Sequence, residues 1–188
     1  MAVAVPLRLG TLAEPVVGLV PISLDEADAY LAEWAHYLGP LDRPFRNDAW
    51  ALDLNGTPIS IATSSSIVGE TSAGYPKSEA VELSRLCTQP GCEWATRVML
   101  RLWREAAAPL WPCPAPRAGQ SALAAVAYSK NDRHEGRIYR FDGWTKVTDR
   151  AGSSGGGTWS HKRRDSDEAN GLKTLWLWRY PVAEAEQR

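Results

Sequence analysis

Two side chains in this sequence could carry proton-transfer chemistry, the imidazole of His36 and the phenol of Tyr139. His36 has an unperturbed pKa of about 6.5, which suits a general base near neutrality; alternatively it ends a helix, where a cation is favourable. Tyr139 lies in the run Gly136–Trp144, which reads GRIYRFDGW. A phenol of pKa about 10 passes a proton to a thiolate of pKa about 8.5 only in a preorganised site. Otherwise this tyrosine packs under a sheet.

The sequence offers little sign of a metal centre or a disulfide framework. Its three cysteines are an odd number and contain no C-x-x-C spacing; they are Cys87, Cys92 and Cys113. This usage argues against disulfides and structural zinc, and it indicates a reducing, cytoplasmic location. We therefore predict no metal site from the residues themselves.

The aromatic composition is unusual, with nine tryptophans against two phenylalanines. Core and edge packing is one explanation, and planar surfaces for stacking a base or cofactor are the other. The candidates for such surfaces are Trp50, Trp144, Trp159 and Tyr75.

Charge is distributed unevenly along a chain whose formal net charge is −1. Residues 1–53 contain three basic and eight acidic residues, whereas residues 129–164 contain nine basic and four acidic ones. A positive segment of this kind contacts phosphates or forms a solvated surface. The candidate DNA contacts are Arg133, Arg137, Arg140, Lys162, Arg163 and Arg164.

The length of 188 residues fits one domain, spanning residues 1–188. Residues 1–20 are predicted to form an N-terminal arm, and residues 151–170 a flexible, glycine-rich and basic loop. We expect no membrane span, because no apolar run approaches the ~18–20 residues that one needs, and the N-terminus lacks the layout of a secretory signal.

Hydrophobic periodicity predicts the elements that position these side chains. Ser23 is a helix N-cap with Glu26 completing a capping box, and the helix runs through Leu38 to end at Gly39-Pro40. Asn55-Gly56 predicts a hairpin of strands 49–54 and 58–63, followed by a mobile loop at 64–78.

The second half alternates strands and helices. We predict a strand at 80–87, a helix at 93–107 with Trp94, Val98, Leu102 and Trp103 on its apolar face, and a buried strand at 122–128. A short helix at 135–141 and strands at 144–148 and 174–180 complete the order. This pattern predicts a mixed α/β layer structure.

The run Ile138–Trp144 resembles the L-Y-x-x-x-G-F pattern in the last helix of the GNAT superfamily of N-acetyltransferases. Over roughly residues 30–150 the chain also looks like the Mom family of phage DNA-modification proteins, which are GNAT-like. Three stretches carry this resemblance: His36-Tyr37, VELSRLCT with WATRVMLRLWREA, and AYSKNDRHEGRIYRFDGW. The fold implied is a GNAT-like acyltransferase with a central mixed, splayed sheet flanked by helices.

The Mom resemblance implies a transferase that carbamoylmethylates adenine N6 in double-stranded DNA and so protects phage DNA from restriction in the host cytoplasm. Tyr139, His36 and Tyr37 match residues that this family needs, and Asp132 is the nearest match to an expected acid, although its loop is one residue shorter. An iron requirement suggested for the family would have His36 and Asp132 as its available ligands.

The GNAT resemblance also implies an acyl donor, acetyl-CoA or a related compound, bound by Leu86, Cys87, Thr88, Gly91 and Cys92. The donor's pyrophosphate needs free backbone N–H groups at a helix start. The sequence departs from the usual motif here, since Pro90 removes a donor, Trp94 replaces a small residue and Glu93 adds negative charge.

Two alternatives to DNA modification stay open. One is an acetyl-CoA-dependent N-acetyltransferase acting on a small amine or a protein. The other is a non-catalytic DNA-binding accessory protein. The donor, the DNA sequence context and a homodimeric state are not determined by the sequence.

Overall fold

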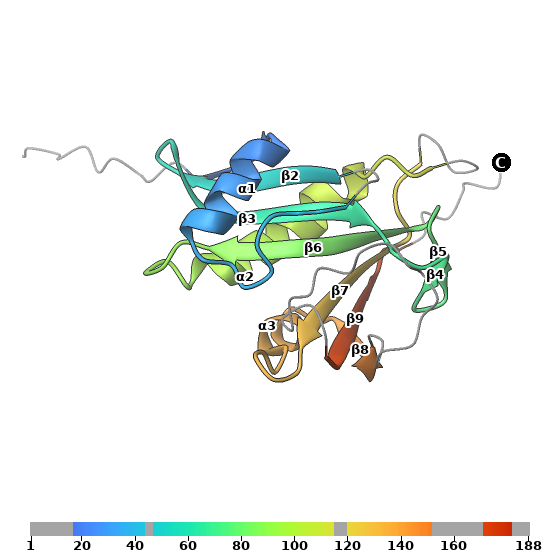
Figure 1. The fold of residues 1–188 in the computed structure, drawn as a ribbon. Helices are drawn as coiled ribbons and strands as arrows, with labels where there is room; N and C mark the ends of the chain where they lie inside the picture. The colour runs from blue at the N-terminus through green and yellow to red at the C-terminus, as the bar shows by residue number, and fades with distance from the viewer. Residues whose placement is uncertain (1–16, 44–46, 115–119, 152–170, 182–188) are drawn as a thin grey trace, which may run out of the picture.

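A seven-stranded mixed sheet organises the computed structural model, which describes residues 17–43, 47–114, 120–151 and 171–181 (Figure 1). The strand order is β1-β2-β3-β6-β7-β9-β8, and β6–β7 is the parallel pair while the others are antiparallel. The strands are β1 (Val17–Ile22), β2 (Asn47–Leu54), β3 (Thr57–Ser66), β6 (Ala80–Thr88), β7 (Ala124–Lys130), β8 (Thr145–Ala151) and β9 (Lys173–Arg179). The mixed α/β layer structure predicted from the sequence is confirmed. The predictions for Trp159, Lys162, Arg163, Arg164 and most of the arm and the basic loop fall outside the described residues.

Helices cover both faces of the sheet. Helix α1 (Leu24–Glu33) packs on Ala51 and Ile61, whereas the face bearing Leu52 and Ala62 packs against α2 (Ala95–Leu102). Because consecutive strand residues point to opposite faces, α1 and α2 lie on opposite sides. No helix among the described residues is long and apolar enough to cross a membrane.

The capping box at the start of α1 is confirmed, but the helix ends earlier than predicted. Ser23 Oγ accepts from the Glu26 N–H, and Glu26 Oε2 accepts from the Ser23 N–H at 2.8 Å. At the other end Ala35 adopts φ +52°, and the His36 N–H donates to Leu31 O at 2.9 Å. These are the features of a Schellman motif. His36 and Tyr37 therefore lie in the turn after α1 rather than on the helix.

The Asn55-Gly56 hairpin is confirmed, with both residues at positive φ as a type I′ turn requires. The predicted loop at 64–78 is only partly correct. β3 extends to Ser66, and a small hairpin of β4 (Thr71–Ser72) and β5 (Tyr75–Pro76) follows.

The predicted apolar face of the second helix is only partly correct. Trp103 is buried and Leu102 packs partly buried against the core, but Trp94 and Val98 are exposed, and Ala95, Met99 and Leu100 are buried instead. The helix starts at Ala95 and passes into a π-helical turn at Trp103–Ala107. The tertiary contacts of the sheet therefore decide which residues face inward.

Strands β6 and β7 pair over only part of their length. Ala80–Leu83 pair with Ala124–Ala127, after which β6 follows β3 and β7 follows β9. Figure 1 shows β6 and β7 close together at the start of each strand and diverging toward their ends. The helix α3 (Arg137–Phe141) lies beside this opening.

Candidate functional site

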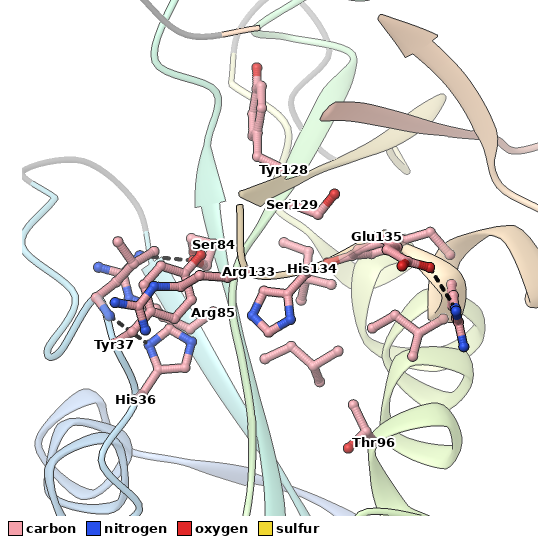
Figure 2. Close-up of a pocket in the computed structure, with 17 residues that line it drawn as sticks. His36, Tyr37, Ser84, Arg85, Thr96, Tyr128, Ser129, Arg133, His134 and Glu135 are labelled. Carbon is pink, nitrogen blue, oxygen red and sulfur yellow. Dashed lines mark hydrogen bonds and ion pairs between the residues drawn. The ribbon is translucent and has the colours of Figure 1, made fainter. Parts of the chain in front are cut away.

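A cavity of about 480 Å³ lies where β6 and β7 separate (Figure 2). Its wall comes from β6 (residues 83–86), from Tyr128 and Ser129 of β7, from the turn at 36–38, from residues 133–139 and from Thr96 of α2. Five separate segments thus converge on one space. Its size suits a small molecule or one exposed base.

The cavity brings together the two side chains that could carry proton transfer. His36, Tyr37 and Tyr139 all line it, although about a hundred residues separate the first two from Tyr139 in sequence. Thus His36, Tyr37 and Tyr139 share one cleft.

Tyr139 is fixed by aromatic packing. Its ring stacks on Trp176 with ring centres 5.6 Å apart and meets the edge of Trp144 at 5.5 Å. Gly136, which precedes α3 at φ +66°, lets the chain pass directly over Trp176. Burial, with a smaller contribution from Tyr37, raises the pKa of the Tyr139 phenol, so the hydroxyl stays protonated at physiological pH.

His36 is held as a neutral imidazole. Burial, followed by the charges of Arg85 and His134, lowers its pKa to about 4. Its Nδ1 accepts the Leu38 N–H at 3.3 Å, so the neutral ring carries its proton on Nε2. In this tautomer His36 presents a hydrogen-bond donor to the cavity instead of the general base that its ordinary pKa suggested.

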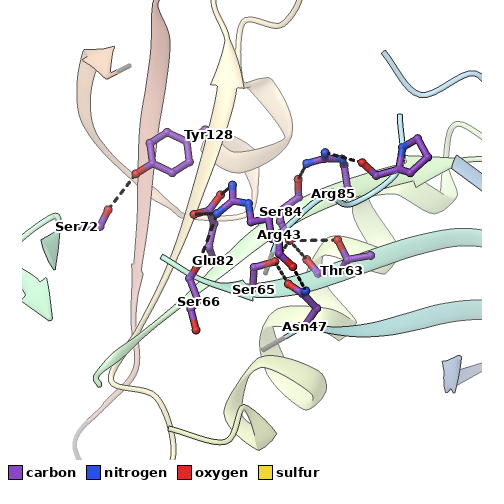
Figure 3. Close-up of polar contacts among 11 residues, drawn as sticks. Arg43, Asn47, Thr63, Ser65, Ser66, Ser72, Glu82, Ser84, Arg85 and Tyr128 are labelled. Carbon is purple, nitrogen blue, oxygen red and sulfur yellow. Dashed lines mark hydrogen bonds and ion pairs between the residues drawn. The ribbon is translucent and has the colours of Figure 1, made fainter. Parts of the chain in front are cut away.

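Arg85 connects the turn after α1 to β6. Its guanidinium donates to the carbonyl oxygens of Gly39 at 3.0 Å, Pro40 at 3.2 Å and Ser84 at 2.8 Å. Ser84 bulges out of the ladder opposite the step from Thr63 to Ser64, and its hydroxyl donates to Thr63 O at 3.1 Å (Figure 3). A bulge re-aims the residues that follow it. This local irregularity directs Arg85 to the cavity wall.

Sequence reasoning missed His134 and Arg85. His134 lines the cavity beside Tyr37, with ring centres 5.8 Å apart, and burial lowers its pKa. It lies within AYSKNDRHEGRIYRFDGW, so its position in the quoted stretch was the available signal. For Arg85 the signal was a charged residue near the end of a half-buried strand, AVELSRLCT.

Asp132 lies outside the cavity wall. Its side chain is 66% exposed and forms an ion pair with Lys130 at 3.4 Å. Because it does not share the cavity with His36, the pair does not fit an iron site. The described residues contain no group of three His, Cys, Asp or Glu side chains placed to hold a metal.

Only Leu86 of the predicted donor-binding residues lines the cavity. Cys87 is buried against α1 on the other face of the sheet, and Thr88 hydrogen-bonds to Ser60 and Thr96. Gly91 and Cys92 belong to the turn before α2.

Most backbone N–H groups of that turn already donate hydrogen bonds within the protein. The Gly91 N–H donates to Glu93 Oε1 at 2.9 Å, and bonds from Gly91 and from its own N–H lower the pKa of Glu93. The N–H groups of Gln89, Cys92, Ala95 and Thr96 donate to backbone carbonyls, and Pro90 has none. Within residues 89–96, all of which the structure describes, the Trp94 N–H is the one backbone donor that remains for a phosphate. The Glu93 carboxylate therefore takes the place that a phosphate would need.

The predicted DNA contacts divide between the cavity and the surface. Arg133 and Arg137 line the cavity, Arg133 with its Cζ 5.1 Å from the centre of the Tyr37 ring. Arg140 is exposed on α3 outside the cavity wall.

Among the aromatic candidates for base stacking, none that the structure describes lines the cavity. Trp144 is buried against Tyr139, Trp50 is partly buried against the same hydrophobic cluster, and Tyr75 packs on a separate one. The aromatic wall consists instead of Tyr37, Tyr128 and Tyr139.

Solved structures with the same arrangement identify the architecture. The fold is that of the GNAT acetyltransferases. A GNAT-family acetyltransferase of Chromobacterium violaceum matches with a TM-score of 0.55 at 10% identity, covering 87% of each chain. A Salmonella typhimurium protein described as an acetyltransferase, solved with acetyl-CoA, matches with a TM-score of 0.53 at 15% identity over 90% of this chain and 96% of that one.

An N-acetyltransferase of Campylobacter jejuni in complex with acetyl-coenzyme A also matches, with a TM-score of 0.50 at 9% identity over 88% of this chain and all of that one (100%). No protein-family model matches the sequence, and no curated protein does. Because the sequence identities to these structures are only 9–15%, the likeness establishes the GNAT fold alone.

Proposed function

We propose that this protein is an acyltransferase that moves the acyl group of a thioester donor, of the acetyl-CoA class, to an amine. The observation that carries the proposal is the cavity at the β6–β7 opening, which has a protonated phenol and two imidazoles in its wall. The GNAT fold, and the acetyl-CoA named with two of its structural neighbours, support a thioester donor.

Tyr139 would act on the leaving group. As the amine attacks the thioester carbonyl, a C–N bond forms, the C–S bond breaks and negative charge develops on sulfur. The phenol donates a hydrogen bond to that sulfur and supplies the proton that gives the free thiol, and the phenolate is then reprotonated by the proton that the amine has lost. Its fixed stacking on Trp176 is the preorganisation that this transfer needs.

His134 would take the proton that the amine loses. It is more exposed than His36, so its ring remains accessible to an incoming amine. His36 Nε2–H would donate to the developing carbonyl oxyanion, the role that a neutral imidazole with an occupied Nδ1 can fill.

Thiol release with acetyl-CoA and a panel of amines tests the proposal, together with calorimetric titration of coenzyme A. We expect CoA binding, and thiol release that depends on the amine. Absence of both CoA binding and thiol release would contradict the acetyl-CoA reading.

Adenine N6 modification in DNA is the second candidate, and the side chains beside the cavity favour it. Arg133 and Arg137 in the cavity wall and Arg140 on α3 could contact phosphates, and the three tyrosines could flank a flipped adenine. The Mom resemblance implies a carbamoylmethyl product that shields phage DNA from restriction.

Mass spectrometry of nucleosides from cells that express the protein tests this second candidate. Modified adenine with the wild-type protein, absent with Tyr139→Phe, is the expected result. If DNA is bound but Tyr139→Phe changes nothing measurable, the protein is instead a non-catalytic DNA-binding accessory.

A further inference from the structure

The cavity offers little that could hold a positively charged acceptor. Glu135 is the one carboxylate among the described residues that line it. That carboxylate lies at the exposed rim and already accepts from Arg137 Nε at 2.7 Å. An ammonium group that enters the cavity therefore loses water of hydration and meets no carboxylate that is free of another cation.

The positive charge of Arg85 also acts against a cation in this cavity. The guanidinium donates to the carbonyl oxygens of Gly39, Pro40 and Ser84, which carry no formal charge. The charge of Arg85 adds to the effect of burial in lowering the pKa of His36 to about 4. An ammonium group beside His36 is disfavoured for the same reason, because a like charge raises the free energy of the protonated form.

Aromatic rings form a flat part of the cavity wall. The ring of Tyr37 contacts those of His36 and His134, with ring centres 5.0 Å and 5.8 Å apart (Figure 2). Contacts between aromatic rings contribute stabilisation beyond the area that they bury. This part of the wall therefore suits a planar, aromatic acceptor better than a flexible alkyl chain.

The imidazoles of the cavity are weak bases. Burial lowers the pKa of both His36 and His134. An alkylammonium, with a pKa of about 10 like that of lysine, is not deprotonated by such a base near neutrality. An arylamine arrives uncharged because its lone pair is delocalised into the ring, and its nitrogen becomes strongly acidic only as it bonds to the carbonyl carbon. His134 is then basic enough to take the proton.

We propose that the acceptor is an arylamine, a primary amine on an aromatic ring that is uncharged at neutral pH, rather than an alkylamine. This inference rests on the proposed acyltransferase function and adds the substrate class to it. The aromatic ring of the acceptor lies against Tyr37 and the two imidazoles. As the C–N bond forms and the C–S bond breaks, the nitrogen proton passes to His134 and the sulfur takes its proton from Tyr139. The proton on His134 then restores the phenol.

Matched acceptors test the substrate class in the thiol-release assay with acetyl-CoA at pH 7. The compound 4-methylaniline is compared with 4-methylbenzylamine, which keeps the ring but has a basic amine, and with cyclohexylamine, which has no aromatic ring. At this pH only about one part in a thousand of an alkylamine is neutral. We expect 4-methylaniline to be preferred by roughly tenfold or more in kcat/KM, although its nitrogen is the weaker nucleophile.

The variant Arg137→Gln tests the argument from charge. It releases the Glu135 carboxylate at the cavity rim, so the preference for 4-methylaniline over 4-methylbenzylamine should fall about threefold. Arg137 is exposed, so the variant should fold. Arg101→Gln is the matched control, because it removes an exposed arginine paired with Glu105 outside the cavity wall. It should leave the preference unchanged.

A second measurement does not depend on catalysis. The two aromatic amines, 4-methylaniline and 4-methylbenzylamine, are titrated separately into the protein at pH 7 while the amide resonances of residues 36–38 and 134–136 are followed by NMR. We expect saturable shifts with 4-methylaniline, and binding of 4-methylbenzylamine that is weaker by about fivefold or more, because its charge is desolvated without a counter-ion.

The outcomes separate the two proposals. Saturable binding of 4-methylaniline without acylation of any amine would support the arylamine class and count against the acyltransferase function. Acylation of the two alkylamines as efficiently as 4-methylaniline, or more so, would overturn the arylamine class and leave the function standing. Neither binding nor acylation would contradict both.

Discussion

At the scale of single residues, burial and neighbouring charge favour the neutral forms of the two imidazoles and the phenol of the cavity. The pKa of His36 is lowered to about 4 and that of Tyr139 is raised, so both side chains are neutral around pH 7. Arg85 alongside them stays charged. The same cavity therefore offers hydrogen-bond donors and cationic side chains, with His134 as the more exposed imidazole that can accept a proton.

The lowered pKa of His36 predicts loss of stability in acid. Between its ordinary pKa of 6.5 and about 4 the unfolded chain binds more protons, so stability falls as the pH drops through this window. The contribution of His36 to this loss should be about 2 kcal/mol, allowing for partial solvent screening. Urea unfolding at pH 7 and pH 4.5 measures it.

His36→Asn is the informative comparison, because its Oδ1 can still accept the Leu38 N–H bond. The variant should lose less stability than the wild type on going to pH 4.5. An equal loss in both proteins would show that another group accounts for the acid sensitivity.

Tyr139→Phe removes the hydroxyl and keeps the aromatic packing on Trp176 and Trp144. Under the proposed function the rate of thiol release should fall by about a hundredfold or more, with the melting temperature little changed. Tyr180→Phe is the matched control, since the hydroxyl of the half-buried Tyr180 donates to Arg104 O at 2.8 Å and lies outside the cavity wall. It should cost about 1 kcal/mol of stability and leave the rate intact.

At the scale of elements, the entry to α3 depends on Gly136. A Cβ at this position would lie 2.2 Å from Trp176 Cζ2, and the backbone is at φ +66°. Gly136→Ala should therefore destabilise the fold by roughly 3 kcal/mol and displace Tyr139.

Gly143→Ala provides the comparison on the other side of α3. Gly143 also has positive φ, but a Cβ there would meet Trp178 at an ordinary 3.5 Å. Backbone strain alone should cost about 1–2 kcal/mol. Chemical denaturation that ranks the two variants equally would contradict the proposed clash with Trp176.

The turn between β6 and α2 predicts weak recognition of the donor's phosphates. Glu93→Ala should free the Gly91 N–H and remove a negative charge, so affinity for CoA should rise about threefold to tenfold by calorimetry. The acetyl thioester of N-acetylcysteamine, which lacks phosphates, should be used at an unchanged rate.

Glu33→Ala, an exposed change at the end of α1, is the control for general charge effects. It should leave CoA affinity unaltered. A Glu93→Ala variant with wild-type CoA affinity would mean that the carboxylate does not compete with the donor's phosphates.

At the scale of the whole molecule, a buried ion pair joins the helical connection after α2 to the last part of the sheet. Arg104 Nε donates to Asp142 Oδ2 at 2.9 Å, and the Trp144 indole N–H donates to the same oxygen at 3.0 Å. The Arg104 guanidinium lies 3.7 Å from the centre of the Trp178 ring in β9. Asp142, which is part of the quoted GRIYRFDGW run, thus has a structural role.

Asp142→Ala should destabilise the protein by about 3–5 kcal/mol, because the buried Arg104 cation loses its buried partner and keeps the exposed Glu105 carboxylate in its place. Asp149→Ala, which removes an exposed pair with Lys146 on β8, should cost less than about 1 kcal/mol. Urea denaturation of both variants measures the difference. Similar losses would indicate that Arg104 finds another partner.

The sequence predicted the features that depend on residues a few positions apart. The Ser23 capping box, the Asn55-Gly56 hairpin and the buried strand after residue 122 all follow from local hydrogen bonding or from alternation. The order of these elements was sufficient to predict a mixed α/β sheet, and the resemblance added the GNAT architecture.

Only the tertiary structure decided which of these residues share a cavity. His36, Arg85, His134 and Tyr139 come from distant segments, and they meet because β6 and β7 stop pairing after Leu83 and Ala127. The same packing shifted the buried face of α2, ended α1 at a left-handed Ala35 and left Asp132 in solvent. Local patterns specify elements through short-range bonds, whereas a cavity depends on where strands part and on which side chains then remain unpacked.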